Sequence, residues 1–365
     1  MSAPIPSFIE KTKDTHTMSK RTATNAGVHI DLALLRRMAA NIRAVEAEPH
    51  ALAHPGGFQH DRICAANESL LVEGYFSEPL TTFAVGFRDT AALEEELEFV
   101  APAVPVNRRF EYAESTNAEQ LLSETTDDER PIKGDFKSVE YTSGKVNAKT
   151  VNRGLMIEID LDEVADKANW REAATGKLIS RLRRNSLRRA VALLAAAATN
   201  TAKTWDTTAG KDPDQDVISD LVTATTAAGT RPNRVLYGET AWSKRLLAHR
   251  AQNSAGGFAS AGLTEAQVAA FLAVESVRYS RARYQSAAAT KSEIVSNLVI
   301  MFNAMTGADT EDPSNIKRFI SPVEGGGYLR VYEQQLTAKR YAITVEHYEL
   351  TKITQTLGVR KFTVS

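Results

Sequence analysis

The side chains best suited to bind a metal ion are gathered near the N-terminus. Four of them fall within fifteen positions: His50, His54, His60 and Cys64. Imidazole nitrogen and thiolate sulfur are ligands that zinc prefers. The spacing is irregular, however, and a Pro-Gly-Gly sequence interrupts it. We therefore interpret these residues as loop histidines and a buried thiol, and we predict neither a metal ion nor another cofactor.

A run of carboxylates forms a second cluster that could do chemistry. It consists of Glu94, Glu95, Glu96 and Glu98. Carboxylate oxygens bind divalent cations, but adjacent positions on a helix point in different directions. The interpretation that we favour is a solvated helix face whose charges repel one another.

Five arginines crowd one short section of the chain, namely Arg181, Arg183, Arg184, Arg188 and Arg189. Guanidinium groups match phosphates bidentately, so the cluster could neutralise nucleic acid. They could equally pair with carboxylates of a neighbouring segment. Aromatic residues are not interleaved with the arginines as a base-stacking surface requires. Sequence-specific recognition of nucleic acid is therefore not predicted, and the two other interpretations stay open.

The sequence motifs of the common catalytic classes are absent. No G-x-x-x-x-G-K-[ST], G-x-G-x-x-G, G-x-S-x-G, H-E-x-x-H or paired C-x-x-C occurs, so the usual phosphate, acyl-transfer and metalloprotease sites lack their anchors. The glycine turn at 325–327 precedes no helix N-terminus and is interpreted as an ordinary tight turn. We predict no catalytic residues and hence no enzyme.

Composition limits the class of protein further. The chain has 365 residues, a formal net charge of −1 and 43% hydrophobic residues. This argues for about two folded domains and against a generally basic protein that coats nucleic acid. The single cysteine excludes an intrachain disulfide. We expect neither a secretion signal nor a membrane-spanning helix, because no apolar run has the required length.

Periodicity divides the chain into a succession of unlike elements. The strongest helical pattern covers about residues 164–200, which are rich in Ala, Leu and Arg. We expect a bend or break of this helix at Gly176. The small residues of 254–262 predict a loop. In chain order we predict an arm over 1–27, a two-stranded ribbon over about 107–160, the 164–200 helix, an α/β unit over 210–330 and closing strands over 339–364.

The ribbon is polarised in charge. Residues 111–129 contain seven carboxylates and no Lys or Arg, whereas 130–153 carries six cations against two acids. Alternation at Leu155, Ile157 and Ile159 predicts a strand in its second half. Because an isolated hairpin is only marginally stable in water, the ribbon needs a partner surface.

This order of elements resembles the major capsid proteins of tailed bacteriophages, whose fold is shared with encapsulin shells. The resemblance covers about residues 80–365. It rests on loose motifs: Phe83-Ala84-Val85-Gly86 followed by Ala101-Pro102-Ala103-Val104-Pro105-Val106 and an Arg-Arg-Phe-Glu-Tyr run, and Pro232-Asn233-Arg234-Val235-Leu236-Tyr237-Gly238 with Trp242.

The resemblance implies an α+β phage capsid fold with an N-terminal arm, an extended β-hairpin loop, a peripheral domain with a long spine helix and an α/β axial domain. The implied division is 1–80 arm with a short helix, 81–106 segment leading into the peripheral domain, 107–160 extended loop, 161–209 spine helix, 210–335 axial domain and 336–365 return strands of the peripheral domain.

The implied function is that of a major capsid protein that self-assembles into the icosahedral shell around a double-stranded DNA phage genome. Its partners would be copies of itself in pentamers and hexamers, a portal, a separate scaffolding protein and DNA contacted non-specifically, with no membrane. It would be located in the virion capsid after assembly in the bacterial cytoplasm. The alternatives are an encapsulin-type compartment shell and a nucleic-acid-binding protein that uses residues 181–189.

We predict that charged side chains of the ribbon and the long helix make the contacts between subunits and guide their registration. These are Arg108, Arg109, Glu124, Asp127, Asp128, Glu129, Lys133, Lys137, Lys145, Lys149, Arg153, Arg181, Arg184 and Arg188. Such charges set docking orientation more than binding strength.

Overall fold

The computed structural model describes most of the chain after residue 74. The described residues are 75–89, 91–114, 130, 132–136, 144–307, 309–322 and 327–365. The predicted arm up to residue 74, the cluster from His50 to Cys64 and most of the glycine turn lie outside them.

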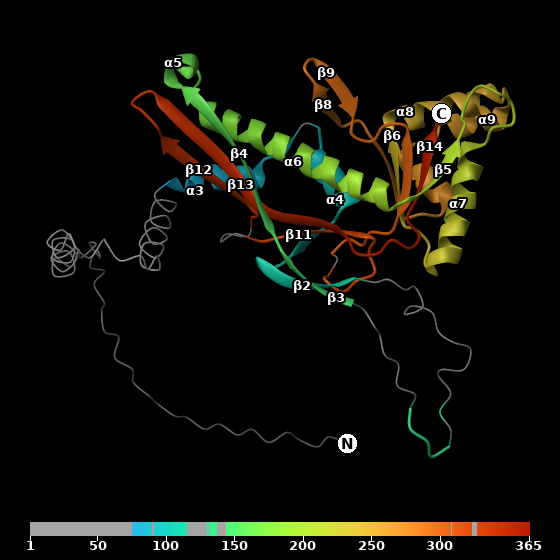
Figure 1. Cartoon of the computed structure of the whole chain (residues 1–365). Helices are drawn as coiled ribbons and strands as arrows, with labels where there is room; N and C mark the ends of the chain where they lie inside the picture. Colours follow the sequence, from blue (N-terminus) through green and yellow to red (C-terminus); the bar gives the residue numbers. More distant parts are fainter. Residues whose placement is uncertain are drawn as a thin grey trace, which may run out of the picture. The chain divides into compact units, whose positions relative to one another are not determined.

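One long helix, α6 (Trp170–Ala197), runs through the fold and contacts both of its large sheets (Figure 1). Its 28 residues correspond to about 42 Å at 1.5 Å per residue. The predicted helix over 164–200 is therefore confirmed, but it is shorter than predicted. It begins at Trp170, after the separate short helix α5 (Leu161–Val164), and ends at Ala197. Leu178 and Leu182 pack on one sheet, whereas Val191 and Leu194 pack on the other.

The first sheet, here called the long sheet, lies along the N-terminal half of α6 and is centred on β13 (Arg340–Ile353). Tyr341, Ile343 and Val345 alternate with more polar residues and pack toward α6, as the sequence pattern predicts. The other strands are β1 (Ala103–Pro105), β4 (Val151–Asp160), β11 (Ile316–Ile320) and β12 (Leu329–Gln335). Helix α3 (Glu78–Gly86) packs against β12 and α6.

Strand β4 belongs to the long sheet and not to the ribbon in which it was predicted. It pairs antiparallel with β13 along its whole length, from Asp160 opposite Arg340 to Val151 opposite Glu349. On its apolar face, Ile159 is buried in the cluster that α6 covers, and the partly buried Leu155 and Ile157 pack against that cluster. The predicted ribbon is thus too long, because a two-stranded hairpin offers no comparable apolar surface.

The second sheet, here called the α/β sheet, has the strand order β5-β14-β10-β6-β7. Its strands are β5 (Thr199–Lys203), β14 (Arg360–Val364), β10 (Leu298–Phe302), β6 (Arg234–Gly238) and β7 (Ser276–Ser280). Strand β6 is buried at every position. Such a strand must have both faces of its sheet covered.

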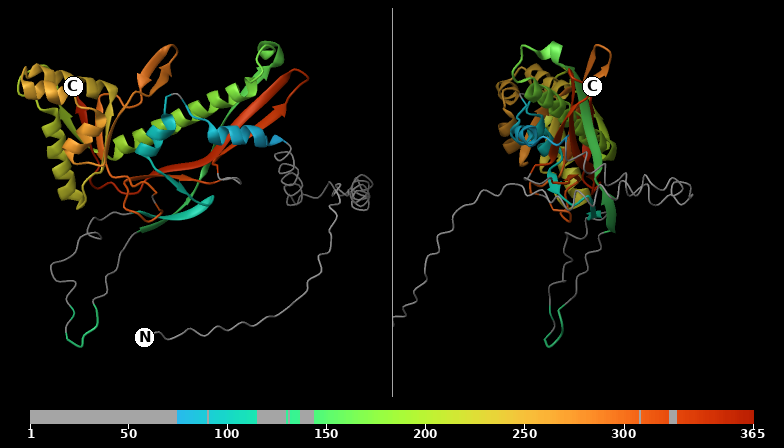
Figure 2. Two further views of the ribbon diagram at one scale, coloured as in Figure 1. Left: turned by 180° about the vertical axis from the view of Figure 1, so that it is seen from behind. Right: turned by 90° about the vertical axis from the view of Figure 1, so that its left-hand side faces the viewer.

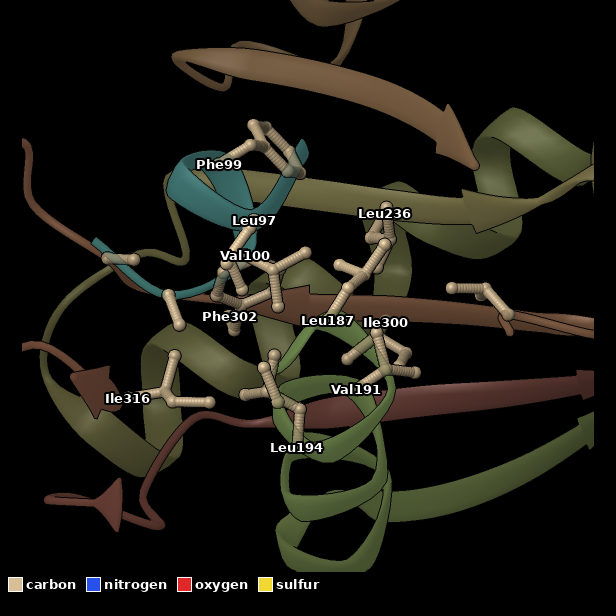
Figure 3. Packing of buried hydrophobic residues seen from close by; sticks show 14 of the residues in the cluster. Leu97, Phe99, Val100, Leu187, Val191, Leu194, Leu236, Ile300, Phe302 and Ile316 are labelled. Carbon is tan, nitrogen blue, oxygen red and sulfur yellow. The ribbon is translucent and has the colours of Figure 1, made fainter. Parts of the chain in front are cut away.

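Two separate cores provide that cover. On one face, Leu236, Ile300 and Phe302 pack against α6 and α4 (Leu93–Val100), as Figure 3 shows. On the other face, Val235 and Val299 pack in a core with residues of three helices. These helices are α7 (Pro213–Ala228), α8 (Glu239–Ala251) and α10 (Glu265–Leu272).

A short two-stranded sheet forms the base of the ribbon. It pairs β2 (Arg109–Glu114) with β3 (Gly144–Lys149). The rings of Phe110 and Tyr112 pack against Phe319 of β11 in tilted arrangements, with centroids 4.6 and 5.1 Å from that of Phe319. A second hairpin, β8 (Arg283–Ala287) with β9 (Thr290–Glu293), projects from the α/β unit (Figure 2).

Three local predictions are wrong. The segment 254–262 contains helix α9 (Ala255–Ala261), which begins at a Ser254 cap, so small residues here form a helix and not a loop. The prediction places strands β11 and β12 in the 210–335 unit, but both belong to the long sheet. Conversely, the prediction places β14 among the return strands of 336–365, but it lies between β5 and β10 in the α/β sheet. Phe362 and Val364 are fully buried there.

Gly176 does not bend α6; it makes room for Phe87. A Cβ at this position would lie 2.9 Å from Phe87 Cε2. We expect Gly176→Val to lower the free energy of unfolding by about 1–3 kcal/mol because it overpacks this contact. Urea unfolding measures the change. The control is Lys177→Val, which adds the same side chain at the adjacent exposed position; an equal loss in both variants would contradict the steric explanation.

Candidate intersubunit surface

Helix α6 carries a stripe of cations on its outer side. Lys177, Arg181, Arg184 and Arg188 follow one another at steps of four, three and four residues. Residues at such steps lie on the same face of a helix. Lys177, Arg181 and Arg188 are exposed, whereas Arg184 is half-buried. Among the described residues, no carboxylate forms an ion pair with these four side chains. The stripe contains all three α6 residues predicted to make contacts between subunits.

The two other arginines of the cluster point inward and are structural. The Arg183 Nε atom lies 2.6 Å from Glu94 Oε2, and Arg189 Nη2 lies 2.9 Å from Glu349 Oε1. Pairing with carboxylates of neighbouring segments is therefore correct for Arg183 and Arg189. The cluster divides by helix face, which its sequence alone does not reveal.

The acidic run on α4 is only in part a solvated face: Glu95 is exposed, but the prediction is wrong for Glu94 and Glu98, which bind groups of the same chain. Glu94 and Glu98 are one turn apart and both bind the buried guanidinium of Arg318, at 3.4 and 2.9 Å. The Tyr328 hydroxyl donates to Glu94 Oε2 at 2.7 Å. Burial and the nearby Glu94 charge raise the pKa of Tyr328 to about 12. These carboxylates hold α4 to the long sheet.

Glu349 of β13 completes this ionic layer and is almost fully buried. It accepts hydrogen bonds from Ser186 Oγ and Arg189 Nη2, each at 2.9 Å. Burial alone would raise the pKa of Glu349, but the adjacent His347 imidazole and the Arg318 and Arg189 guanidiniums hold that pKa well below its usual range. Glu349 is therefore ionised in the folded protein at neutral pH.

The base of the ribbon presents a second charged face. In the β2–β3 pair, Phe110, Tyr112, Val146 and Ala148 turn toward the core. Alternation places Arg109, Lys145 and Lys149 together on the opposite, exposed face. Three predicted contact residues therefore share one surface.

Three predicted contact residues also make contacts within the chain, and one of them is Arg188, whose guanidinium lies 4.0 Å from the centre of the Tyr284 ring. The Arg108 guanidinium lies 3.8 Å from the centre of the Tyr348 ring, although Arg108 remains exposed. Arg153 lies on β4, half-buried, and burial followed by the Arg189 charge lowers its pKa. The remaining predicted residues Glu124, Asp127, Asp128, Glu129 and Lys137 lie outside the described residues.

The segment 132–136 of the ribbon exposes two large apolar side chains that the sequence analysis missed. Ile132 is 96% exposed and Phe136 is 77% exposed, the highest values among the described large hydrophobic residues. Lys133 has φ +68°, and Arg130 Nε donates to the Gly134 carbonyl at 2.5 Å. The sequence feature that could have indicated this exposure is the presence of two large apolar residues within a run of charged and turn-forming residues.

The described part of the chain shows no metal centre and no membrane helix. No three His, Cys, Asp or Glu side chains within it are grouped closely enough to hold a metal ion. Within the same residues, no helix is both long and apolar enough to cross a membrane.

Comparison with solved structures identifies the fold. A phage-related protein from Bordetella bronchiseptica is similar, with a TM-score of 0.60 and 16% identity over 79% of this chain and 96% of that one. The cyanophage P-SCSP1u capsid has a TM-score of 0.48 at 9% identity, covering 76% of this chain and 89% of that one. The SrpI encapsulin of Synechococcus elongatus has a TM-score of 0.42 at 10% identity, covering 76% and 90% respectively.

No family model matches the sequence, and no curated protein matches it. The chain has a phage major capsid protein-like fold, which confirms the predicted fold class. At 16% identity the likeness shows the fold alone.

We expect acid to weaken the fold through Glu349. Because its folded-state pKa lies below the unfolded value, its contribution to stability is complete above that unfolded value, near 4.5, and is lost as the pH falls toward the folded-state pKa. Glu349→Gln should cost roughly 3 kcal/mol at pH 7 and reduce the loss of stability between pH 7 and pH 3.5. Urea unfolding at both pH values tests this.

The control is Glu158→Gln, which alters the exposed pair with Arg340 on the adjacent strand. It should leave the pH dependence of unfolding nearly unchanged. A wild-type pH dependence in the Glu349 variant would contradict the assignment.

Proposed function

We propose that this chain is a major capsid protein that self-assembles into the icosahedral shell around a double-stranded DNA phage genome. The observation that carries the proposal is the exposed ribbon segment on a capsid-like fold. Ile132 and Phe136 are 96% and 77% exposed. Covering such side chains releases about 1.5–3 kcal/mol each, so a neighbouring subunit would stabilise the ribbon.

The two halves of the fold suit different tasks in a shell. We assign the long sheet with α6 to the peripheral domain and the α/β sheet with its helices to the axial domain. Because α6 packs on both sheets, it keeps their orientation fixed. A subunit of this kind is stiff in its middle, and the charged face of β2–β3 and the α6 stripe supply orienting contacts at its margins.

The partners follow from this role. Copies of the chain would form the pentamers and hexamers of the shell, with a portal and a separate scaffolding protein taking part in assembly. Packaged DNA would be contacted non-specifically. The protein would be located in the virion capsid after assembly in the bacterial cytoplasm, and it would not be an enzyme.

One observation favours a second function. Lys177, Arg181, Arg184 and Arg188 form an unbroken cationic stripe, which could bind nucleic acid phosphates. DNA affinity of the dispersed protein that falls steeply with salt concentration supports this alternative, whereas assembly into large particles with no such affinity supports the shell.

Light scattering and negative-stain electron microscopy of the expressed full-length chain test the proposed function. We expect closed particles of uniform diameter. A chain that stays monomeric across a wide range of concentrations, with and without added crowding agent, would contradict it.

Reversal of the ribbon cations should impair assembly without unfolding the subunit. We expect Lys133→Glu, Lys137→Glu and Lys145→Glu together to reduce particle yield strongly. Each exposed contact contributes only about 0.2–1 kcal/mol, but every subunit loses three. Particle yield is measured by sedimentation and folding by circular dichroism.

The matched control reverses three exposed lysines elsewhere, Lys167, Lys291 and Lys352. It carries the same change in net charge and should assemble normally. Normal particle yield in the ribbon variant, or an equal defect in both variants, would argue against charge-guided registration.

A further inference from the structure

The α6 stripe is straight and short. Its four cations, from Lys177 to Arg188, lie within an arc of about 60° on the helix and extend over about 16 Å along its axis. Ala173 lies one turn before the stripe and Ala192 one turn after it, and both alanines are exposed. Short side chains at a contact let two helices approach each other closely. The outer side of α6 therefore offers a row of cations between two places where a second helix can approach closely.

The cations of the stripe are partly held in place, but their charge is not neutralised. The Arg188 guanidinium lies 4.0 Å from the centre of the Tyr284 ring on β8, a contact that leaves its charge unpaired. Asp89 lies to the side of Arg184. Burial raises the pKa of Asp89, but hydrogen bonds and the charges of Arg184 and Arg183 bring it below its ordinary value. Because no described carboxylate forms an ion pair with the stripe, most of its charge is available to a partner.

The charge changes sign immediately before the stripe. Residues 160–172 carry five carboxylates and two cations, and one of these cations, Arg171, pairs with Glu333 at 2.6 Å. Duplex DNA carries one negative charge per about 1.7 Å of its axis over its whole length. A duplex that continues along α6 beyond Lys177 therefore meets like charge. A short acidic segment that ends with the stripe does not.

The spacing of the stripe matches the face of a second helix. On an α-helix, carboxylates at steps of four, three and four residues lie on one face, in a row of the same length as the four cations. Each carboxylate can then oppose one cation. The phosphates of a duplex wind around its axis and leave a straight row after a few contacts. The geometry thus favours a protein helix over nucleic acid.

From these observations we infer that the α6 stripe docks the acidic face of a helix from a second protein. The inference deepens the proposed shell function and rests on it for the role of this partner, which is the separate scaffolding protein. Each exposed ion pair contributes only about 0.2–1 kcal/mol. The contact is therefore weak for one subunit, and it becomes strong where many copies bind a multivalent partner.

Fluorescence anisotropy with the full chain and two synthetic peptides tests the inference. Both peptides are alanine-rich and about 20 residues long, which allows them to form helices. The aligned peptide carries four glutamates at steps of four, three and four. The spread peptide carries the same four glutamates at steps of five, which distributes them around the helix. We expect the aligned peptide to bind about fivefold more tightly or better at low salt.

A variant of the stripe tests where the aligned peptide binds. Lys177→Glu together with Arg181→Glu should weaken its binding by about tenfold or more, because two attractions become repulsions. The matched control is Arg250→Glu with Lys352→Glu, which also reverses one arginine and one lysine at exposed positions, on α8 and β13. It should leave the affinity nearly unchanged. Circular dichroism checks that both variants are folded.

The outcomes separate this inference from the shell function. Equal binding of the two peptides, or equal effects of the two variants, overturns the inference. It is also overturned if neither peptide binds, whether or not a short DNA duplex binds the stripe instead. Tighter binding of the aligned peptide that only the stripe variant weakens supports it.

Peptide binding is measured on the dispersed chain and does not depend on particle formation. Closed particles without peptide binding therefore leave the shell function standing and overturn the docking inference. Peptide binding by a chain that never forms particles removes the shell function and, with it, the scaffolding role of the partner.

Discussion

The fold depends on a single helix that belongs to two cores. The first half of α6 is buried against the long sheet through Leu178 and Leu182, and its second half is buried against the α/β sheet through Val191 and Leu194. Neither sheet can rotate relative to the other without exposing one of these surfaces. A continuous helix of 28 residues therefore fixes the relative orientation of the two sheets.

Between the two apolar contacts, α6 is held by charged groups. Arg183 binds Glu94, and Ser186 and Arg189 bind Glu349. Arg318 joins α4 to the same layer through Glu94 and Glu98. Buried ion pairs contribute little net stability, but leaving one partner alone is costly. The layer thus specifies how α4, α6 and the long sheet meet more than it increases their stability.

The exposed surfaces follow from this internal arrangement. Arg183 and Arg189 are used inside, and Arg171 pairs with Glu333; the other α6 cations form the stripe on the outer side of the helix. The β2–β3 pair buries its aromatic face on β11 and presents Arg109, Lys145 and Lys149 outward. In the proposed shell, such a subunit would be rigid in its centre and would meet its neighbours through charged margins.

The sequence by itself determined the elements whose signals are local. Local patterns predicted the long helix α6, and strand alternation predicted β4 with its inward face, because these patterns depend only on helix and strand geometry. The charge polarity of the ribbon was also predicted from the sequence, whereas the exposed Ile132 and Phe136 were not.

The tertiary structure alone decided which strands pair and which charges meet. β4 joins β13, and β14 enters the α/β sheet, because the best burial for Leu155 or Phe362 depends on surfaces far away in the chain. Glu94 and Glu98 become anchors only because Arg318, more than two hundred residues later, is buried beside them. Gly176 makes room for the Phe87 ring and is not a hinge. The sequence could not show this, because Phe87 comes close to Gly176 only in the folded chain.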